Sequence, residues 1–291
     1  MSWRTVVITK RSKLDLQMGC LVVRNDEIKR IFLDEVAIII CEATSISITT
    51  ALLAECIKRK IKVIFCDEKH SPISELVSCH GSFDSYRKIM EQMSWKRKIK
   101  DRIWGKIVKS KIENQAKVAN EFSSSCQASE LEKCAISVLP GDPTNAEGHA
   151  ARMYFRLIFG EDFKRSNYDS VNSALNYGYS LLLSAFNRSI TSAGYLLQVG
   201  IKHCNPYNPF NFSCDLMEPF RALIDQKVLT IDSRGQEFSI DEKHELIGIF
   251  GEKITVNNTQ QSLLNAIEIF VHSVVHALNT DDPSLIANVK I

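Results

Sequence analysis

The stretch 171–186, VNSALNYGYSLLLSAF, spaces its apolar and small residues as one buried side of an α-helix does. The residues that share this side are Val171, Ala174, Leu175, Gly178, Tyr179, Leu182, Leu183 and Phe186. Weaker patterns of the same kind predict helices at about 145–159, 215–228, 241–250 and 260–278, with two more within 83–122. The sequence from 95 to 291 is therefore predicted to form an all-α domain.

The first eighty residues have a different pattern. Short segments rich in β-branched residues occur at 5–9, 21–24, 28–33, 36–41 and 62–66, with turn-forming residues such as Asn25 and Asp26 between them. One helical pattern at about 50–60 interrupts these strands. We therefore predict an α+β fold with two domains: a β-sheet domain with one helix over 1–80, a linker or helix over 81–94, and the all-α domain over 95–291.

The composition is that of a globular protein. The chain has 291 residues, of which 45% are hydrophobic and 24% charged, enough to bury a substantial core. No secretion signal is found at the amino terminus and no apolar run is long enough to cross a bilayer, so we expect a cytoplasmic protein with no membrane partner. The nine cysteines form no C-x-x-C pair, and we expect them to be small buried hydrophobic residues.

Positive charge is concentrated in one segment. The net charge is only +2, but residues 96–111 include eight lysines and arginines and a single acid, Asp101. Apolar residues in the same segment fall on the opposite side of the predicted helix. Such a stripe is typical of a surface that binds a polyanion, and also of an ordinary solvated helix face.

Polar residues interrupt the apolar patterns at two places. Glu147 falls on the apolar side of its predicted helix, one turn before Ala150 and Ala151. A carboxylate there needs a cation or a proton, although an acid in the first turn also suits the helix dipole. His203 follows an apolar stretch that ends at Val199, where a histidine is often an ordinary packed or exposed residue.

A third place is the string DLMEPFR at 215–221. Its acids, Asp215 and Glu218, are three residues apart and would share one side of a helix, although this spacing is also typical of a capping box with Asp215 as the N-cap. Together with Glu147 and His203 they offer carboxylate oxygens and one imidazole, a donor set that suits Mg²⁺ or Mn²⁺. The spacing leaves open whether residue 147 lies near residues 203 and 218.

These segments carry a resemblance to a known family. The strings NAEGHAARMYF at 145–155, NSALNYGY at 172–179, GIKH at 200–203, NF at 211–212 and DLMEPFR at 215–221 resemble blocks of the CRISPR-associated spacer-acquisition integrase. That protein is an endonuclease and the catalytic subunit of the CRISPR adaptation complex. The resemblance covers nearly the full length and is greatest for the type II subfamily. One departure is Ala222, where relatives often have proline.

The resemblance implies that Glu147, His203 and Glu218 are the catalytic metal ligands for Mg²⁺ or Mn²⁺, and that Asp215 occupies an assisting position. The implied activity is insertion of short DNA spacers into a CRISPR array, by attack of a 3′-hydroxyl on a phosphodiester at the repeat boundary. Basic residues are expected to contact the DNA backbone, and the candidates are Lys96, Lys98, Arg102, Arg152, Arg165, Lys202 and Arg221.

The resemblance also implies partners. These are double-stranded prespacer and leader-repeat DNA, a second copy bound through the β-rich domain, a small ferredoxin-like adaptation subunit in a heterohexamer, and other type II adaptation proteins. Two alternatives stay open: a related transposon integrase with the same chemistry, and a DNA-binding scaffold without catalysis. No helix-turn-helix tail follows Ile291, which disfavours the first, and the intact Glu147, His203 and Glu218 disfavour the second.

Overall fold

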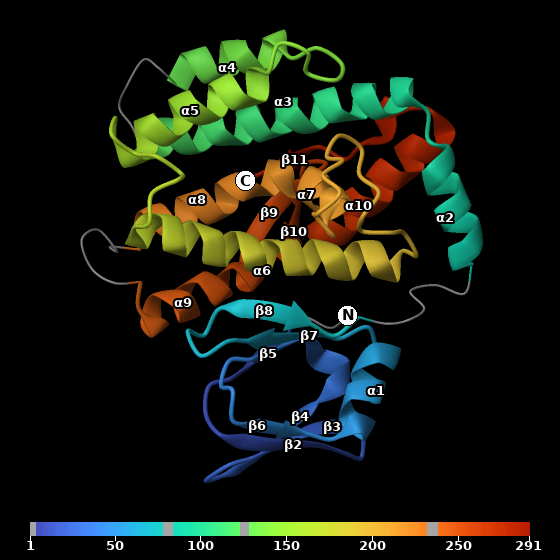
Figure 1. Cartoon of the computed structure of the whole chain (residues 1–291), viewed down its shortest axis with the longest axis vertical. Helices are drawn as coiled ribbons and strands as arrows, with labels where there is room; N and C mark the ends of the chain where they lie inside the picture. The colour runs from blue at the N-terminus through green and yellow to red at the C-terminus, as the bar shows by residue number, and fades with distance from the viewer. Residues whose placement is uncertain (1–3, 78–83, 123–127, 232–237) are drawn as a thin grey trace. The chain divides into compact units, whose positions relative to one another are not determined.

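The computed structural model describes residues 4–77, 84–122, 128–231 and 238–291. The chain divides into two compact units, Met1–Gly81 and Ser82–Ile291 (Figure 1). Each unit is built around its own core. No helix among the described residues is long and apolar enough to cross a membrane.

The first unit contains two four-stranded sheets. One has the order β1-β5-β7-β8, with β8 antiparallel to three parallel strands: β1 (Arg4–Ile8), β5 (Val36–Cys41), β7 (Lys62–Cys66) and β8 (Pro72–Glu75). The other has the order β4-β3-β2-β6: β4 (Ile28–Phe32), β3 (Cys20–Arg24), β2 (Ser12–Gln17) and β6 (Ile46–Ile48). The helix α1 (Thr50–Lys58) contacts β2 and β7, one strand of each sheet.

The sequence predicts five of the eight strands described in this unit, β1, β3, β4, β5 and β7. All six residues of β5 are buried, because this parallel strand is covered on both faces, and a continuous apolar run is the expected pattern there. The sequence prediction missed β2, β6 and β8, whose side chains are largely polar or partly exposed. Short or edge strands of this kind carry little apolar signal.

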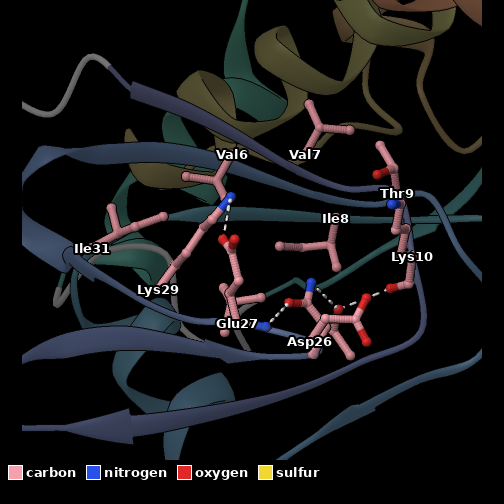
Figure 2. A pocket seen from close by; sticks show the side chains of 12 residues that line it. Val6, Val7, Ile8, Thr9, Lys10, Asp26, Glu27, Lys29 and Ile31 are labelled. Atoms are coloured by element: carbon pink, nitrogen blue, oxygen red, sulfur yellow. Dashed lines mark hydrogen bonds and ion pairs between the residues drawn. The ribbon is translucent and has the colours of Figure 1, made fainter.

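A pocket lies beside β1, between residues of the two sheets. It has a volume of about 460 Å³ and is lined by residues of β1, β3 and β4 and of the turn before β4. Figure 2 shows Val6 and Ile8 of β1 with Ile31 of β4, and the side chains of Glu27 and Lys29, which form an ion pair at 3.6 Å. Because β1 and β4 are the outermost strands of their sheets, the pocket lies beside two unpaired strand edges of this unit.

The second unit is largely helical, and α3 is its central element. The helices α7 and α8 contact both α3 and α6 and lie between them, and α4 and α5 pack on α3 (Figure 1). The helices are α2 (Ser85–Ser94), α3 (Arg97–Phe122), α4 (Ala128–Ser137), α5 (Ala146–Phe159), α6 (Ser170–Ser192), α7 (Asn211–Met217), α8 (Arg221–Thr230), α9 (Ile240–Ile247) and α10 (Leu263–Thr280). A 3₁₀ turn, Glu218–Phe220, joins α7 to α8.

The prediction of an all-α second domain is wrong in one respect. Three strands form a small sheet of order β10-β9-β11: β9 (Lys253–Val256), β10 (Thr259–Ser262) and β11 (Val289–Lys290). Asn257 and Asn258 have φ of 47° and 65°, as a two-residue hairpin between β9 and β10 requires. The strands are only two to four residues long, so the alternation of polar and apolar residues along them is too short to be detected in the sequence.

The expectation that the cysteines are buried is confirmed for the four described cysteines of the first unit, but not for those of the second unit. Cys20, Cys41, Cys56 and Cys66 are buried, and burial raises the pKa of the Cys41 thiol to about 12. Cys204 in the second unit is exposed, while Cys134 and Cys214 are partly buried. These seven are all free thiols. Cys79 and Cys126 lie outside the described residues.

A close contact between α6 and α8 positions the buried carboxylate of Asp225 in α8. A Cβ at Gly178 would lie 2.5 Å from Cγ2 of Ile224, so only glycine allows this approach. One residue further along each helix, the Tyr179 hydroxyl donates a hydrogen bond to the fully buried Asp225. Burial raises the pKa of Asp225 from 3.8 to about 6.

We predict that Asp225→Asn changes how stability depends on pH. As the pH falls through 6, native Asp225 takes up a proton while the unfolded chain stays ionised to about 4, so this group adds stability on acidification. The asparagine variant lacks that gain, which is about 1–2 kcal/mol between pH 7.5 and pH 5. Urea unfolding of both proteins at about pH 7.5 and about pH 5 measures it. An identical pH dependence in the two proteins would contradict the assignment.

Candidate active site

Glu147 is fixed at the start of α5. The carboxylate of Asp142 accepts hydrogen bonds from the backbone N–H of Ala146 at 2.8 Å and of Glu147 at 3.1 Å, and so caps the helix. Asn145, the residue before the helix, has a left-handed φ of 54°. Glu147 therefore lies in the first turn, and its side chain still faces the interior, where it is 24% exposed. Glu147 is thus both an acid in the first helical turn and a carboxylate on the inward side, so the two interpretations of the sequence are compatible.

Asp215 organises the loop that carries His203. Its carboxylate is completely buried and accepts hydrogen bonds from the backbone N–H of Ile201 at 2.5 Å, Lys202 at 3.0 Å and His203 at 3.1 Å. It also faces Nδ1 of His203 at 2.6 Å. A carboxylate accepts at that distance, so Nδ1 carries the hydrogen and Nε2 of the neutral ring keeps its lone pair. This hydrogen bond raises the pKa of His203.

The capping-box interpretation of 215–218 is wrong. Asp215 lies inside α7, which begins at Asn211, and its oxygens are used by the loop at 201–203 rather than by its own helix. The loop needs a carboxylate at this point because three N–H groups converge on it, and each would otherwise be buried without a partner.

Glu218 is buried in the 3₁₀ turn and is shared between two cations. Its Oε1 lies 2.9 Å from Nε of Arg221, one turn on, and its Oε2 lies 2.5 Å from Nζ of Lys111 on α3. Burial alone would raise the pKa of Glu218, but Arg221 and Lys111 outweigh it and hold the pKa below its usual range. The carboxylate is therefore ionised inside the protein.

Lys111 joins Glu218 to Glu147. Its Nζ donates to Oε1 of Glu147 at 2.6 Å, so the carboxylates of Glu147 and Glu218 converge on one ammonium. Burial alone would lower the pKa of Lys111, and the two carboxylates outweigh this and raise it. His203 lies against the same helix α3, with its ring centre 5.8 Å from that of Trp104, two turns before Lys111. Glu218 and Glu147 also raise the pKa of His203. The structure thus brings together the three residues that were separate in the sequence.

Lys111 is the site residue that sequence reasoning missed. It belonged to the basic stripe 96–111, which was predicted to lie opposite the apolar side of the helix. Lys111 instead follows Ile107 by four residues and Val108 by three, on the buried side, and it is 8% exposed. This spacing from Ile107 and Val108 was the signal in the sequence that could have placed Lys111 on the buried side. Within the described residues, no three or more His, Cys, Asp and Glu side chains enclose a single point where a metal ion would fit.

The basic candidates for DNA contact fall into two groups. Lys96, Lys98, Arg102 and Arg152 are exposed. The other three already contact protein groups: Lys202 donates to the carbonyl of Gly141 at 2.8 Å, Arg165 donates to Asn176 at 2.7 Å, and Arg221 binds Glu218 with its guanidinium 4.7 Å from the Tyr179 ring centre. Their expected DNA contacts remain predictions.

Gly200 provides a test of how the His203 loop is built. A Cβ at Gly200 would lie 2.5 Å from the carbonyl oxygen of His203 and 2.6 Å from Oδ2 of Asp215. We predict that Gly200→Ala displaces this loop and destabilises the fold by about 2 kcal/mol or more. Gly248→Ala is the matched control, because open space surrounds Gly248 and its φ is −55°. Chemical unfolding compares the variants, and equal stability of the two would refute the crowding at Gly200.

Comparison with known proteins gives a consistent result for the sequence. The family profile described as CRISPR associated protein Cas1 matches residues 5–247. A CRISPR-associated endonuclease Cas1 from Neisseria meningitidis serogroup C (strain 8013) is 34% identical over 278 residues, which is 94% of this chain and 91% of that protein. Another, from Francisella tularensis subsp. novicida (strain U112), is 27% identical over 243 residues, 74% of each chain.

Solved structures share the fold. A casposase bound to integration product matches with a TM-score of 0.76 and 16% identity, covering 97% of this chain and 92% of that one. A Cas1 protein from Thermotoga maritima matches with a TM-score of 0.72 and 15% identity, covering 94% and 97%. The profile match over most of the sequence, and the 34% identity across nearly all of it, lead to one conclusion. This chain belongs to the Cas1 family of CRISPR-associated proteins.

Proposed function

We propose that this Cas1-family chain is a DNA integrase and endonuclease that depends on a divalent metal ion, Mg²⁺ or Mn²⁺. In the proposed reaction the 3′-hydroxyl of a short DNA spacer attacks a phosphodiester at a repeat boundary of a CRISPR array. The observation that carries the proposal is the convergence of Glu147 and Glu218 on one cation beside His203. A buried and a partly buried carboxylate that meet in this way form a site for a cation.

The donor set fits the proposed ion. Glu147 and Glu218 offer hard carboxylate oxygens, and His203 offers Nε2 because Asp215 occupies Nδ1. These three residues would hold the ion. When bound, such an ion supplies Lewis-acid stabilisation of charge on the phosphate and orientation of the reacting oxygens.

The chain's own residues have separate tasks in this proposal. Asp215 fixes the ring of His203 and keeps its Nε2 lone pair directed away from the Asp215 carboxylate. Arg221 orients Glu218, and the Tyr179 ring holds the guanidinium of Arg221 in turn. The exposed Lys96, Lys98, Arg102 and Arg152 would bind DNA phosphates. These tasks are positioning and charge neutralisation, which is what phosphoryl transfer asks of a protein.

The nucleophile is proposed to come with the DNA. The hydroxyl of Tyr179, whose ring contacts the Arg221 guanidinium, donates a hydrogen bond to Asp225, and burial raises the pKa of its phenol well above the usual value. A protonated, buried phenol is a poor nucleophile, and an attack by substrate hydroxyl needs no covalent protein–DNA intermediate.

Partners follow from the family. Solved structures of similar fold include a Cas6-RT-Cas1–Cas2 complex, with a TM-score of 0.75 and 19% identity, and a casposase bound to integration product. We infer that this chain binds double-stranded DNA and a small ferredoxin-like adaptation subunit in a heterohexamer, and that it belongs to the type II subfamily. The unpaired edges of β1 and β4 beside the pocket in Figure 2 support a homodimer through the first unit.

The transposon integrase remains the second candidate. The observation that supports it is the similar fold of the casposase, whose TM-score of 0.76 is close to the 0.72 of the Thermotoga maritima Cas1 protein. Both candidates use the same strand-transfer chemistry, so the choice between them depends on the DNA target. A target plasmid that carries the leader and repeat, compared with one that lacks them, separates the two.

We predict that Glu147→Ala, His203→Ala and Glu218→Ala each reduce integration by about a hundredfold or more, because each removes one proposed ligand. Joining of labelled spacer DNA to a target plasmid, in the presence of the partner subunit and Mn²⁺, measures the effect. Glu113→Ala is the matched control, since Glu113 lies on α3 with its side chain 51% exposed. Near wild-type joining by any of the three ligand variants would remove that residue from the site.

We further predict that joining requires a 3′-hydroxyl on the spacer. Spacers ending in 3′-hydroxyl or 3′-phosphate are supplied to the same protein with Mn²⁺, Mg²⁺ or a chelator. Joined product should form only with the hydroxyl end and a metal, because the attacking oxygen belongs to the substrate. Equal joining of the phosphate-ended DNA, or protein that remains attached to DNA after denaturation, would contradict this chemistry.

A further inference from the structure

Lys111 differs from Lys109, another lysine of α3, in where its charge is directed. Its side chain is 10% exposed and its ammonium lies within 2.6 Å of two carboxylate oxygens, one from Glu147 and one from Glu218. Lys109, two residues earlier, has a side chain that is 49% exposed and pairs with Glu113 at 3.9 Å. Lys111 is therefore part of the active-site architecture rather than of the basic surface.

The position of Lys111 is fixed by the packing of α3. One turn further along the helix, the side-chain amide of Asn114 donates to the carbonyl of Pro219 at 2.8 Å and to that of Val289 at 3.2 Å. Pro219 is the residue directly after Glu218, so these bonds hold α3 in register against the turn that carries the carboxylate. Lys111 cannot leave the site by movement of its helix without breaking buried hydrogen bonds.

Both glutamates already have a cation in direct contact. Glu147 and Glu218 carry two negative charges, and Lys111 and Arg221 carry two positive charges in contact with them. The neighbouring carboxylate of Asp215 is occupied by the His203 loop. A divalent ion needs lone pairs of Glu147 and Glu218, and it adds two positive charges directly beside Lys111 and Arg221. Such an excess is unfavourable unless negative charge arrives with it, and a DNA phosphodiester supplies that charge.

We propose that Lys111 competes with the divalent metal ion for Glu147 and Glu218, and that metal binding is therefore coupled to the binding of DNA phosphate. This inference rests on the proposed function, in which the two glutamates are metal ligands. Lys111 keeps the ligands together and keeps the metal affinity low until DNA is present. By linkage, the metal must raise the affinity for DNA by the same factor.

The test measures Mn²⁺ binding rather than activity. The full-length chain is titrated with Mn²⁺, and the free ion is followed by electron paramagnetic resonance, without DNA and with a spacer duplex ending in 3′-phosphate, which is not expected to react. Lys111→Met removes the charge and keeps the length of the side chain. We expect it to bind Mn²⁺ about tenfold or more tightly than wild type without DNA, since a competing cation is gone.

The same titrations measure the coupling. DNA should tighten Mn²⁺ binding by about tenfold in wild type and by much less in Lys111→Met. Lys111→Arg retains the charge and should stay near wild type, and Lys109→Met controls for loss of a lysine charge from α3. The double variant Glu147→Gln/Glu218→Gln removes the proposed site, and its titration with DNA gives the Mn²⁺ that DNA binds by itself.

Several results would overturn the inference. Wild-type or weaker Mn²⁺ affinity in folded Lys111→Met would show that the lysine does not compete. If that variant does not fold, the wild-type chain still decides, because the same Mn²⁺ affinity with and without DNA would exclude the coupling. Failure of the proposed function is distinct: it would appear as Mn²⁺ binding that the glutamate double variant retains, or as wild-type protein that binds Mn²⁺ at this site and joins no DNA.

Discussion

The buried carboxylate of Glu218 is the group on which the second unit's site depends. An ionised carboxylate away from water costs several kcal/mol unless cations meet it, and here Arg221 and Lys111 both do. These cations come from α8 and α3, so the charge requirement ties the two helices to the turn between α7 and α8. The amide of Asn114 strengthens the same junction through the carbonyl of Pro219.

The histidine side of the site is organised by a different constraint. Three consecutive backbone N–H groups, at residues 201–203, converge on the buried carboxylate of Asp215. A turn this tight needs Gly200, whose missing side chain leaves room for Asp215 and for the carbonyl of His203. The orientation of the imidazole is then a consequence of loop folding. In the proposed site Asp215 acts through His203, by fixing the orientation of its ring.

The helix α3 has two sides with different tasks. Its exposed side presents Lys98 and Arg102, and its buried side directs Lys111 to the carboxylates. A basic stripe in a sequence therefore divides into residues suited to hold DNA phosphates and a residue that balances charge inside the protein. Because both belong to one helix, the exposed basic residues and the carboxylate site are held in a fixed relation within this unit.

The sequence by itself determined the elements whose signal is local. The helical period over 171–186, the fully apolar strand Val36–Cys41 and the helix that begins near Glu147 were all predictable, because spacing along the chain reports which faces are buried. Polar residues next to apolar patterns, together with the family resemblance, marked Glu147, His203 and Glu218 as candidates. Short strands such as Lys253–Val256 and polar edge strands were missed, because so few residues carry too little alternation.

Only the tertiary structure decided which candidates meet. Glu147 and Glu218 are 71 residues apart in the chain, and they converge because α5 and the turn before α8 both pack on α3. It also gave Lys111 and Asp215 their tasks, as the cation between two carboxylates and as the acceptor that folds the His203 loop. Charge neutralisation and hydrogen-bond satisfaction act through space, and the spacing of residues along a chain does not encode which distant partner satisfies them.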